Sequence, residues 1–229
     1  HVLAHLHQCD DAQVRQAIDA ALAAQPEWSA MSFEHRAGVF LKAADLIAGP
    51  WRDRLNASTM LGQSKTVYQA EIDVACELAD FLRFNVHFAE RLYAEQPESS
   101  PGTWNRVDYR PLEGFVYAIS PFNFTAIGGN LCTAPAMLGN VVLWKPATTA
   151  SLACWRVMQV LQEAGLPPGV INFVSGDSSM VTRTVLADER LAGIDFTGST
   201  AVFQSLWRDV AQRIDRYRTY PRLVGETGG

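Results

Sequence analysis

The feature that most constrains this chain is a run of 31 residues, from Gly114 to Trp144, without a single charged side chain. A run of this length would cross a membrane if it formed one continuous helix. Helix-breaking residues divide it instead into a strand, a loop, a helix and a second strand. These residues are Pro121, Asn123, Asn130, Pro135 and Asn140, with Gly114, Gly128, Gly129 and Gly139. The pattern predicts a buried unit of an open α/β sheet, and the single polar residues at its strand ends predict a cofactor or catalytic region.

The composition excludes some classes of protein. The 229 residues are 48% hydrophobic, which is enough for one large domain or most of two. The formal net charge is −5, and no block of basic residues interrupts it, so neither a nucleic-acid surface nor a membrane partner is expected. The four cysteines, Cys9, Cys76, Cys132 and Cys154, lie far apart among apolar neighbours. This spacing favours reduced, buried thiols in a reducing compartment over disulfides.

The two ends of the chain predict a piece of a longer protein. The sequence starts at His1 rather than at a methionine, and it stops at Gly228-Gly229 directly after a strand-like segment. Asp10 and Asp11 interrupt any early apolar run, which argues against a signal peptide. A truncated α/β chain is therefore expected.

The first hundred residues are expected to be helical. A helix capped by Asp10 ends near Pro26, and a second, capped by Ser32, ends at Gly49-Pro50. A third, long helix covers about residues 66 to 95, and residues 97 to 102 form a turn-rich exit.

From Trp104 onward the pattern changes to strands that alternate with helices. The expected strands cover residues 106–110, 114–119, 141–144, 170–174, 193–196 and 222–224. The expected helices cover residues 126–138, 151–164, 179–187 and 200–217. Such alternation predicts a parallel sheet with helices on both faces.

The segment from Phe196 to Thr200 ends a strand and opens a helix, so free backbone N–H groups and the helix dipole favour an anion such as a dinucleotide pyrophosphate there. An ordinary Ser or Thr helix cap is the alternative, and it is commoner on local sequence alone. Gly176 predicts a neighbouring close approach at the next strand end. No GxGxxG fingerprint supports a dinucleotide site.

Lys145 and Asn123 stand at the ends of the two buried strands. Lys145 follows one strand and precedes Pro146, which places an ammonium where ribose or phosphate oxygens could bind. A lysine that merely reaches solvent is the alternative, and the absence of charge in the preceding run favours a function. Asn123, between two aromatic residues, could donate to a developing oxyanion in surroundings of low dielectric, or it could satisfy its own turn backbone.

Two glutamates are further candidates. Glu226 lies in a glycine-rich turn after a strand and could activate water as a general base, although an acid in such a turn is usually just solvated. On an ideal α-helix Glu71 has apolar neighbours and Asp73 polar ones, so Glu71 is expected to face the interior and Asp73 the water. A structural ion pair and a contact with a substrate ammonium are equally weighted for Glu71.

A metal site is not predicted. His5, His7 and Cys9 alternate near the start of the chain, but a structural zinc site needs a fourth ligand, and none accompanies them.

Five segments taken together resemble the aldehyde dehydrogenase superfamily in order and spacing across residues 100–229. They are Ser120-Pro121-Phe122-Asn123-Phe124, Lys145-Pro146-Ala147, the segment from Gly165 to Asn172, Phe196-Thr197-Gly198-Ser199 and Glu226-Thr227-Gly228-Gly229.

Further segments resemble the glutamate semialdehyde (pyrroline-5-carboxylate) dehydrogenase branch and extend the resemblance over nearly the whole chain. They are residues 62–66, 69–73, 80–85, 111–115 and 124–131. Most superfamily members have a tryptophan where Phe122 stands and a proline where Thr125 stands.

The resemblance implies NAD as cofactor and a dinucleotide-binding domain that lacks GxGxxG. The residues that it places at NAD are Ser120, Pro121, Phe122, Lys145, Pro146 and Gly176, with Gly198, Ser199, Thr200, Ala201 and Val202 against the pyrophosphate. It implies that Asn123 is the oxyanion donor and Glu226 the general base, and that Glu71 and Phe124 face the substrate. Thr148 stands where many relatives have an acid that binds the adenine ribose, so this residue does not secure NAD over NADP.

The implied organisation is a helical segment of the cofactor domain (1–103), a strand of an oligomerisation arm (104–112) and an incomplete NAD-binding domain (113–229) without the catalytic domain. The implied reaction is oxidation of L-glutamate 5-semialdehyde to glutamate in proline degradation. It begins with attack by a cysteine thiolate, which none of the four cysteines matches, so the chain alone is expected to be inactive.

The whole protein is expected to be a homo-oligomer in the bacterial cytoplasm or, in a eukaryote, in the mitochondrial matrix. Two alternatives remain: a module of a bifunctional proline-oxidising enzyme, and a truncation that only binds NAD or a partner.

Overall fold

The computed structural model describes residues 2–228, and a parallel sheet forms its centre. Gly229, the last residue of the glycine-rich C-terminal motif, lies outside the described residues. The strands are β1 (Phe115–Ser120), β2 (Val141–Pro146), β3 (Ile171–Phe173), β4 (Leu191–Gly198) and β5 (Arg222–Thr227). They lie in the order β3-β2-β1-β4-β5, and every neighbouring pair is parallel. The predicted α/β class and the five strands predicted after residue 113 are confirmed.

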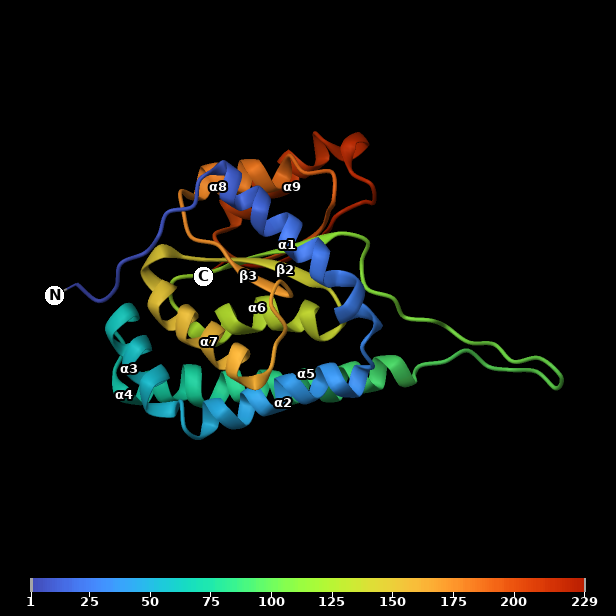
Figure 1. The fold of residues 1–229 in the computed structure, drawn as a ribbon, viewed down its shortest axis with the longest axis horizontal. Coiled ribbons are helices and arrows are strands. Elements are labelled where there is room, and N and C mark those ends of the chain that lie inside the picture. The colour runs from blue at the N-terminus through green and yellow to red at the C-terminus, as the bar shows by residue number, and fades with distance from the viewer. Residues whose placement is uncertain (1, 229) are drawn as a thin grey trace.

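Helices cover both faces of the sheet (Figure 1). On one face lie α1 (Asp11–Ala30), α8 (Ser178–Leu186) and α9 (Thr200–Ala211), and on the other lie α6 (Thr125–Met137) and α7 (Ser151–Ala164). Strand side chains alternate between two hydrophobic clusters, since Tyr117 packs with α1 and α8 whereas Ala118 packs with α6 and α7. The uncharged run is therefore uncharged because both faces of its strands are buried.

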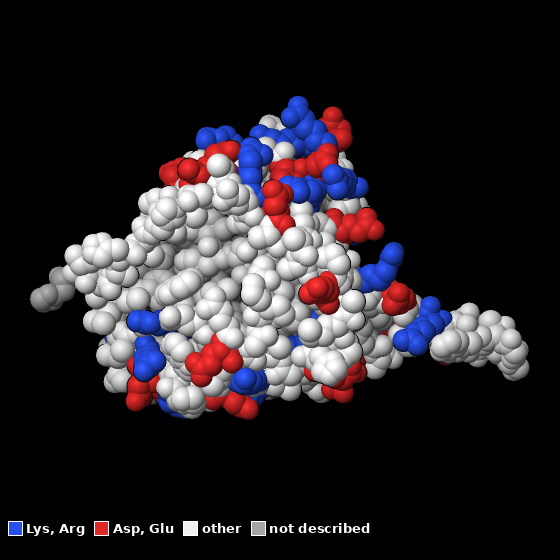
Figure 2. Space-filling model, in the orientation of Figure 1, with Lys and Arg blue, Asp and Glu red and all other residues white. Residues whose placement is uncertain are grey.

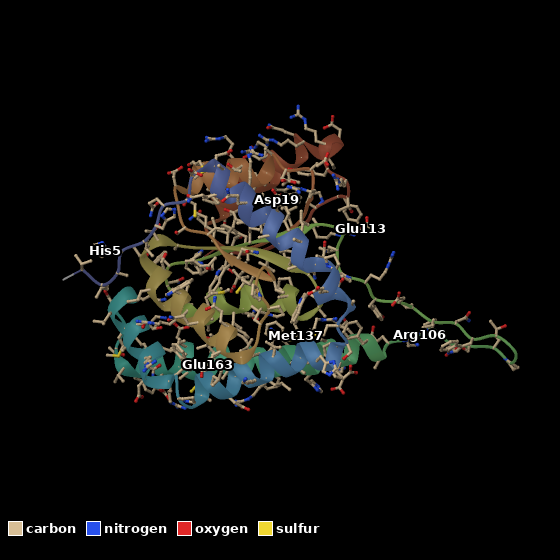
Figure 3. All side chains as sticks on the ribbon, in the orientation of Figure 1. His5, Asp19, Arg106, Glu113, Met137 and Glu163 are labelled. Atoms are coloured by element: carbon tan, nitrogen blue, oxygen red, sulfur yellow. The ribbon has the colours of Figure 1, made fainter. Side chains whose placement is uncertain are left out.

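A further helical layer lies outside α6 and α7 and contains α2 (Phe33–Ala48), α3 (Arg52–Gln63) and α5 (Leu78–Ala94). Asp10 and Ser32 cap α1 and α2, as predicted. The end predicted for α1 at Pro26 is wrong, because the helix continues to Ala30 and buries Trp28, whose Nε1 donates to the carbonyl of Ala136 (2.8 Å). At the other end of the layer, Trp51 donates to Glu163 of α7 (2.8 Å). Figure 3 labels Glu163.

The sequence pattern missed α3. Its buried side chains include Asn56, Ser58 and Thr59 beside Leu55, so the helix shows little hydrophobic periodicity. The long third helix was predicted, but it has three parts: α4 (Val67–Ala70), a π-helical segment η1 (Glu71–Glu77) and α5. Thr66 caps its start through the backbone N–H of Gln69.

The strand predicted over residues 106–110 is wrong. Residues 95–114 form no strand, and in Figure 1 they leave the body as a long, two-legged arm; Figure 3 labels Arg106 on it. Val107 alternates with polar neighbours as an edge strand would, but only the side chain of Gln96 bonds its N–H (2.9 Å). Without a partner strand to complete a backbone ladder, the alternating pattern stays an extended loop.

The helix predicted over residues 200–217 is shorter than expected. It ends at Ala211, and a 3-10 turn, η3 (Ile214–Arg216), follows. The chain then turns back because Tyr217 donates to the carbonyl of Leu186 (2.9 Å). Another 3-10 turn, η2 (Thr148–Ala150), joins β2 to α7.

Charged side chains of both signs are interspersed on the visible face and gather over the α8–α9 side and along the lower helical layer (Figure 2). A wide uncharged area separates the two groups. Among residues 2–228, no helix combines the length and the apolar character that a membrane crossing requires.

Candidate active site

The predicted strand-end residues meet at one edge of the sheet. Because all five strands are parallel, their carboxyl ends lie together, and the strand order reverses beside β1. Ser120 pairs in register with Pro146, and Thr197 with Glu226. A crevice outside strand ends at such a reversal is where open α/β sheets bind ligands. The structure thus brings together the candidates from β1, β2, β4 and β5.

Strand alternation divides these candidates between the two faces. Leu143 packs with the α1 and α8 side, so Lys145, two residues later, faces the same side. Thr197 follows Phe196, which packs on that side, and therefore faces α6. Its hydroxyl donates to Glu226 (3.3 Å), which places this carboxylate on the α6 side.

Lys145 is a buried ammonium without a partner. It is 4% exposed, which favours a buried functional lysine over one that simply reaches solvent. Among residues 2–228 its side chain makes neither a hydrogen bond nor an ion pair. Burial lowers the pKa of Lys145, and the charge of Asp177 acts in the opposite direction. A buried cation without a counter-ion fits an anionic or polyhydroxyl ligand.

The start of α9 lies on the same side as Lys145. Ser199 caps the helix by accepting from the N–H of Val202 (3.4 Å), so the cap that was the commoner alternative is present. Thr200, Ala201 and Val202 form the first turn, where N–H groups and the helix dipole favour an anion. Gly198 immediately precedes this cap at the end of β4.

The close approach predicted at Gly176 is to the chain itself. A Cβ there would meet the carbonyl oxygen of Cys9 at 3.0 Å, and the N–H of Cys9 bonds Ser175 (2.9 Å). The structure therefore gives Gly176 a packing role against the N-terminal segment.

The loop after β1 has a buried start and an exposed middle. Ser120 is 3% exposed, and its hydroxyl accepts from Trp144 (3.0 Å), so this hydroxyl faces the core rather than the crevice. Pro121 is buried, whereas Phe122, Asn123 and Phe124 are exposed. The low-dielectric surroundings expected for Asn123 are therefore not formed by residues 2–228. Its amide also makes no hydrogen bond within them, so it does not satisfy its own turn.

Glu226 is exposed, and its charge affects a second carboxylate, that of Glu77. Burial, followed by the charges of Asp73 and Glu226, raises the pKa of Glu77 on η1, while Lys65 opposes the shift.

The prediction that Glu71 faces the interior and Asp73 the water is wrong. Asp73 is fully buried, whereas the side chain of Glu71 is 30% exposed and is held by Arg52 and Asn56. The cause is the π-helix, whose wider turn rotates Asp73, Val74 and Ala75 inward relative to an α-helix. The structural ion pair, one of the two alternatives for Glu71, is thus observed.

Sequence reasoning missed Lys65, Asp73 and Glu77. Asp73 accepts from Lys65 (2.7 Å) and from the N–H groups of Thr125 (3.0 Å) and Ala126 (2.8 Å). Lys65 also lies 3.9 Å from the ring centroid of Phe124. The available sequence signal was Phe124 itself, because a phenylalanine at a helix N-cap leaves the first N–H groups for another residue to satisfy.

The cysteines and histidines form neither a disulfide nor a metal site within residues 2–228. All four cysteines are free; Cys132 and Cys154 are buried, but Cys76 is exposed and Cys9 half-buried, so the expectation that all four are buried is wrong. Within residues 2–228, no three His, Cys, Asp or Glu side chains are grouped to hold a metal ion.

A family model described as the aldehyde dehydrogenase family matches residues 1–229. The mitochondrial delta-1-pyrroline-5-carboxylate dehydrogenase of Mus musculus is 58% identical over 100% of this chain and 41% of that protein. The delta-1-pyrroline-5-carboxylate dehydrogenase of Agaricus bisporus is 53% identical over 99% of this chain and 42% of that protein. The chain thus spans about two fifths of the length of these relatives.

Solved structures are similarly close. The delta-pyrroline-5-carboxylate dehydrogenase of Mycobacterium tuberculosis, bound with NAD, gives a TM-score of 0.96 at 61% identity over 98% of this chain and 42% of that chain. Proline utilization A from Bdellovibrio bacteriovorus gives 0.88 at 30% identity over 97% of this chain and 23% of that chain.

Proposed function

Because this chain belongs to the aldehyde dehydrogenase family, we propose that the whole protein oxidises L-glutamate 5-semialdehyde, formed from 1-pyrroline-5-carboxylate, to L-glutamate with NAD. The observation that carries this proposal is the 61% identity, at a TM-score of 0.96, to a pyrroline-5-carboxylate dehydrogenase solved with NAD. The strand-end edge supplies groups suited to both cofactor and aldehyde. We propose residues 113–229 as the cofactor domain, joined by the helices of residues 1–103.

The α8–α9 side of the crevice fits a dinucleotide. Lys145, buried and unpaired within residues 2–228, would hold ribose hydroxyls, and Thr200, Ala201 and Val202 would present N–H groups to the pyrophosphate. Pro121, Phe122, Pro146, Ser199 and Gly198 would line the same path. Ser120 would contribute through its backbone, since its hydroxyl holds Trp144. When bound, NAD accepts the hydride that the aldehyde carbon gives up.

The α6 side carries the groups for the carbonyl chemistry. A thiolate adds to the aldehyde, and the amide of Asn123 donates to the oxyanion that forms. After hydride departure, Glu226 takes a proton from water, which then attacks the thioester carbonyl; the carbon–sulfur bond breaks and the thiolate leaves. Burial raises the pKa of both Cys132 and Cys154, so neither thiol in α6 or α7 can supply the nucleophile.

Phe124 and Glu71 are our proposed substrate contacts. The ring of Phe124 is 38% exposed beside Asn123, where it would pack on the aliphatic part of the substrate. Glu71, fixed by Arg52 and Asn56, would face the amino group of the substrate.

We further propose a homo-oligomer in which the arm of residues 104–112 packs on a second subunit. The arm leaves the body and exposes Trp104 (78%), which supports a contact outside the subunit. The relatives from Mus musculus and Homo sapiens are named as mitochondrial. By analogy we place this protein in the matrix of a eukaryote or the cytoplasm of a bacterium.

The bifunctional alternative has weaker support. Similarity to proline utilization A is 30% in identity, against 58% and 61% to the delta-1-pyrroline-5-carboxylate dehydrogenases of Mus musculus and Mycobacterium tuberculosis. A protein that only binds NAD or a partner would be distinguished by kinetics.

The test is steady-state and single-turnover kinetics of the whole protein with pyrroline-5-carboxylate and NAD. We expect Asn123→Ala to slow acylation about 100-fold to 1,000-fold. We expect Glu226→Gln to release one NADH per site and then stall, because the thioester accumulates. Glu90→Gln, at an exposed position of α5, is the matched control and should behave as the parent. A preference for simple aliphatic aldehydes over the semialdehyde would refute the substrate, and unchanged kinetics in both variants would remove the two assigned roles.

A further inference from the structure

The start of α6 is capped by a residue from a different helix. Its N-cap residue, Phe124, has no side-chain oxygen to bond the free N–H groups of the first turn. The carboxylate of Asp73 takes that place, since one oxygen accepts from Ala126 (2.8 Å) and the other from Thr125 (3.0 Å). Because α6 begins at Thr125, two residues after Asn123, this cap fixes the C-terminal end of the loop that presents the amide.

Lys65 holds the same loop from its side. Its ammonium contacts Asp73 (2.7 Å) and lies 3.9 Å from the ring centroid of Phe124, the residue next to Asn123. Its side chain is only 13% exposed, so the pair with Asp73 is shielded from solvent. Lys65 therefore neutralises the buried carboxylate of Asp73 and also contacts the ring of Phe124.

Two residues of α3 complete the arrangement. The hydroxyl of Thr125 is bonded to that of Thr59 (2.9 Å) and accepts from Gln63 (2.8 Å). At the other end of the loop, Ser120 is held by Trp144 and by the N–H of Ala147 (3.1 Å). The loop is thus anchored at residue 120 and at residues 124–126, and only three residues, among them Asn123, lie between the anchors.

We propose that Asp73 and Lys65 are positioning residues that set the place of the Asn123 amide. The π-helical segment supports a dedicated arrangement, because it turns Asp73 inward where an α-helix would turn it to water. The inference rests on the proposed role of Asn123 as oxyanion donor. Neither residue touches the reacting atoms, so each acts through the loop.

The experiment is a double-mutant cycle in the whole protein, with single-turnover NADH formation at saturating NAD as the readout. We expect Asp73→Asn to slow acylation about 10-fold to 100-fold, the effect of a misplaced donor. NAD affinity should stay within about twofold, because Lys145 and the start of α9 lie on the other face of the sheet. Since Asp73 acts through Asn123, the double variant Asp73→Asn with Asn123→Ala should be no slower than Asn123→Ala alone. Lys65→Arg should restore most of the rate that Lys65→Met loses.

Controls separate the inference from the proposed function. Asp80→Asn, on the exposed side of α5, should leave the rate unchanged. A parental rate in Asp73→Asn, or losses that multiply in the double variant, would overturn the positioning role alone. A parental rate in Asn123→Ala would overturn the oxyanion role and this inference with it. If circular dichroism shows that Asp73→Asn does not fold, Lys65→Met enters the same cycle with the same criteria.

Discussion

Two buried charges lie close to the crevice, and their surroundings differ. Asp73, on η1, is fully buried and accepts three hydrogen bonds from Lys65, Thr125 and Ala126. Lys145, at the end of β2, is almost as deeply buried and is bonded to nothing within residues 2–228. A buried charge that is fully paired stabilises the fold around it, whereas one without a partner costs stability and indicates a ligand. The comparison supports a structural role for Asp73 and the proposed cofactor-binding role for Lys145.

The largest expected effect is on stability, at Asp73. Asp73→Ala leaves Lys65 without its counter-ion and exposes two uncapped N–H groups of α6, so we expect a loss of about 3–5 kcal/mol in the free energy of unfolding. Urea denaturation of the whole protein measures it. Asp80→Ala, at an exposed position with only a 4.0 Å contact to Arg83, should stay within about 0.5 kcal/mol. A loss below about 1 kcal/mol for Asp73→Ala would show that the paired Asp73 does not stabilise the fold as proposed.

The next effect is on binding, at Lys145. Lys145→Met removes a buried charge that nothing in the described chain balances, so the free energy of unfolding should not fall, and the affinity for NAD should weaken by about 1.5–3 kcal/mol, the range for a hydrogen bond to a charged group. Calorimetric titration with NAD and urea denaturation report the two quantities. Lys42→Met, on the exposed side of α2, is the matched control. A variant that binds NAD as the parent does would show that Lys145 is not a cofactor residue.

Lys145 and Asp73 also show which site residues can be predicted from the sequence and which cannot. Lys145 could be located because strand periodicity and the uncharged run together specify a buried strand end, and parallel strands must bring their carboxyl ends to one edge. Asp73 could not, because an α-helix of 3.6 residues per turn puts it on the polar side. A π-helix changes which residues face inward without leaving a composition signal.

Two other errors have physical causes of the same kind. The alternation of Val107 and Tyr109 was sufficient for a strand only if a second strand paired with it, and pairing is a tertiary property. Helix α3 was missed because its buried face carries Asn56 and Thr59, whose side chains bond Glu71 and Thr125 outside the helix. Local sequence patterns therefore predict helices and strands whose buried faces are apolar. They fail for elements that form because of polar contacts with distant residues.

Asp195 is a second, half-buried charge without a partner in the described part of the chain, and it gives a further test of the difference between paired and unpaired charges. Asp195, on β4, forms no hydrogen bond or ion pair within residues 2–228, and burial raises the pKa of its carboxyl to about 6. An isolated buried acid can reduce the cost of burial by taking up a proton. Because the carboxyl of Asp195 has no partner among the described residues, we expect it to make the free energy of unfolding depend on pH.

The sign follows from the direction of the shift. Since the pKa of Asp195 is higher in the folded chain, the folded state binds the proton more tightly, and the resulting stabilisation is complete below about pH 4 and is lost as the pH rises through about 6. Asp195→Asn keeps a neutral group at every pH. We expect the free energy of unfolding of the variant, relative to the parent, to rise by about 2 kcal/mol between pH 4 and pH 8, because two pKa units correspond to about 2.7 kcal/mol and partial solvent contact reduces this. Urea denaturation at both pH values measures the difference, with Asp80→Asn as control; a difference that stays constant with pH would mean that Asp195 has a partner or ligand after all, as Asp73 has.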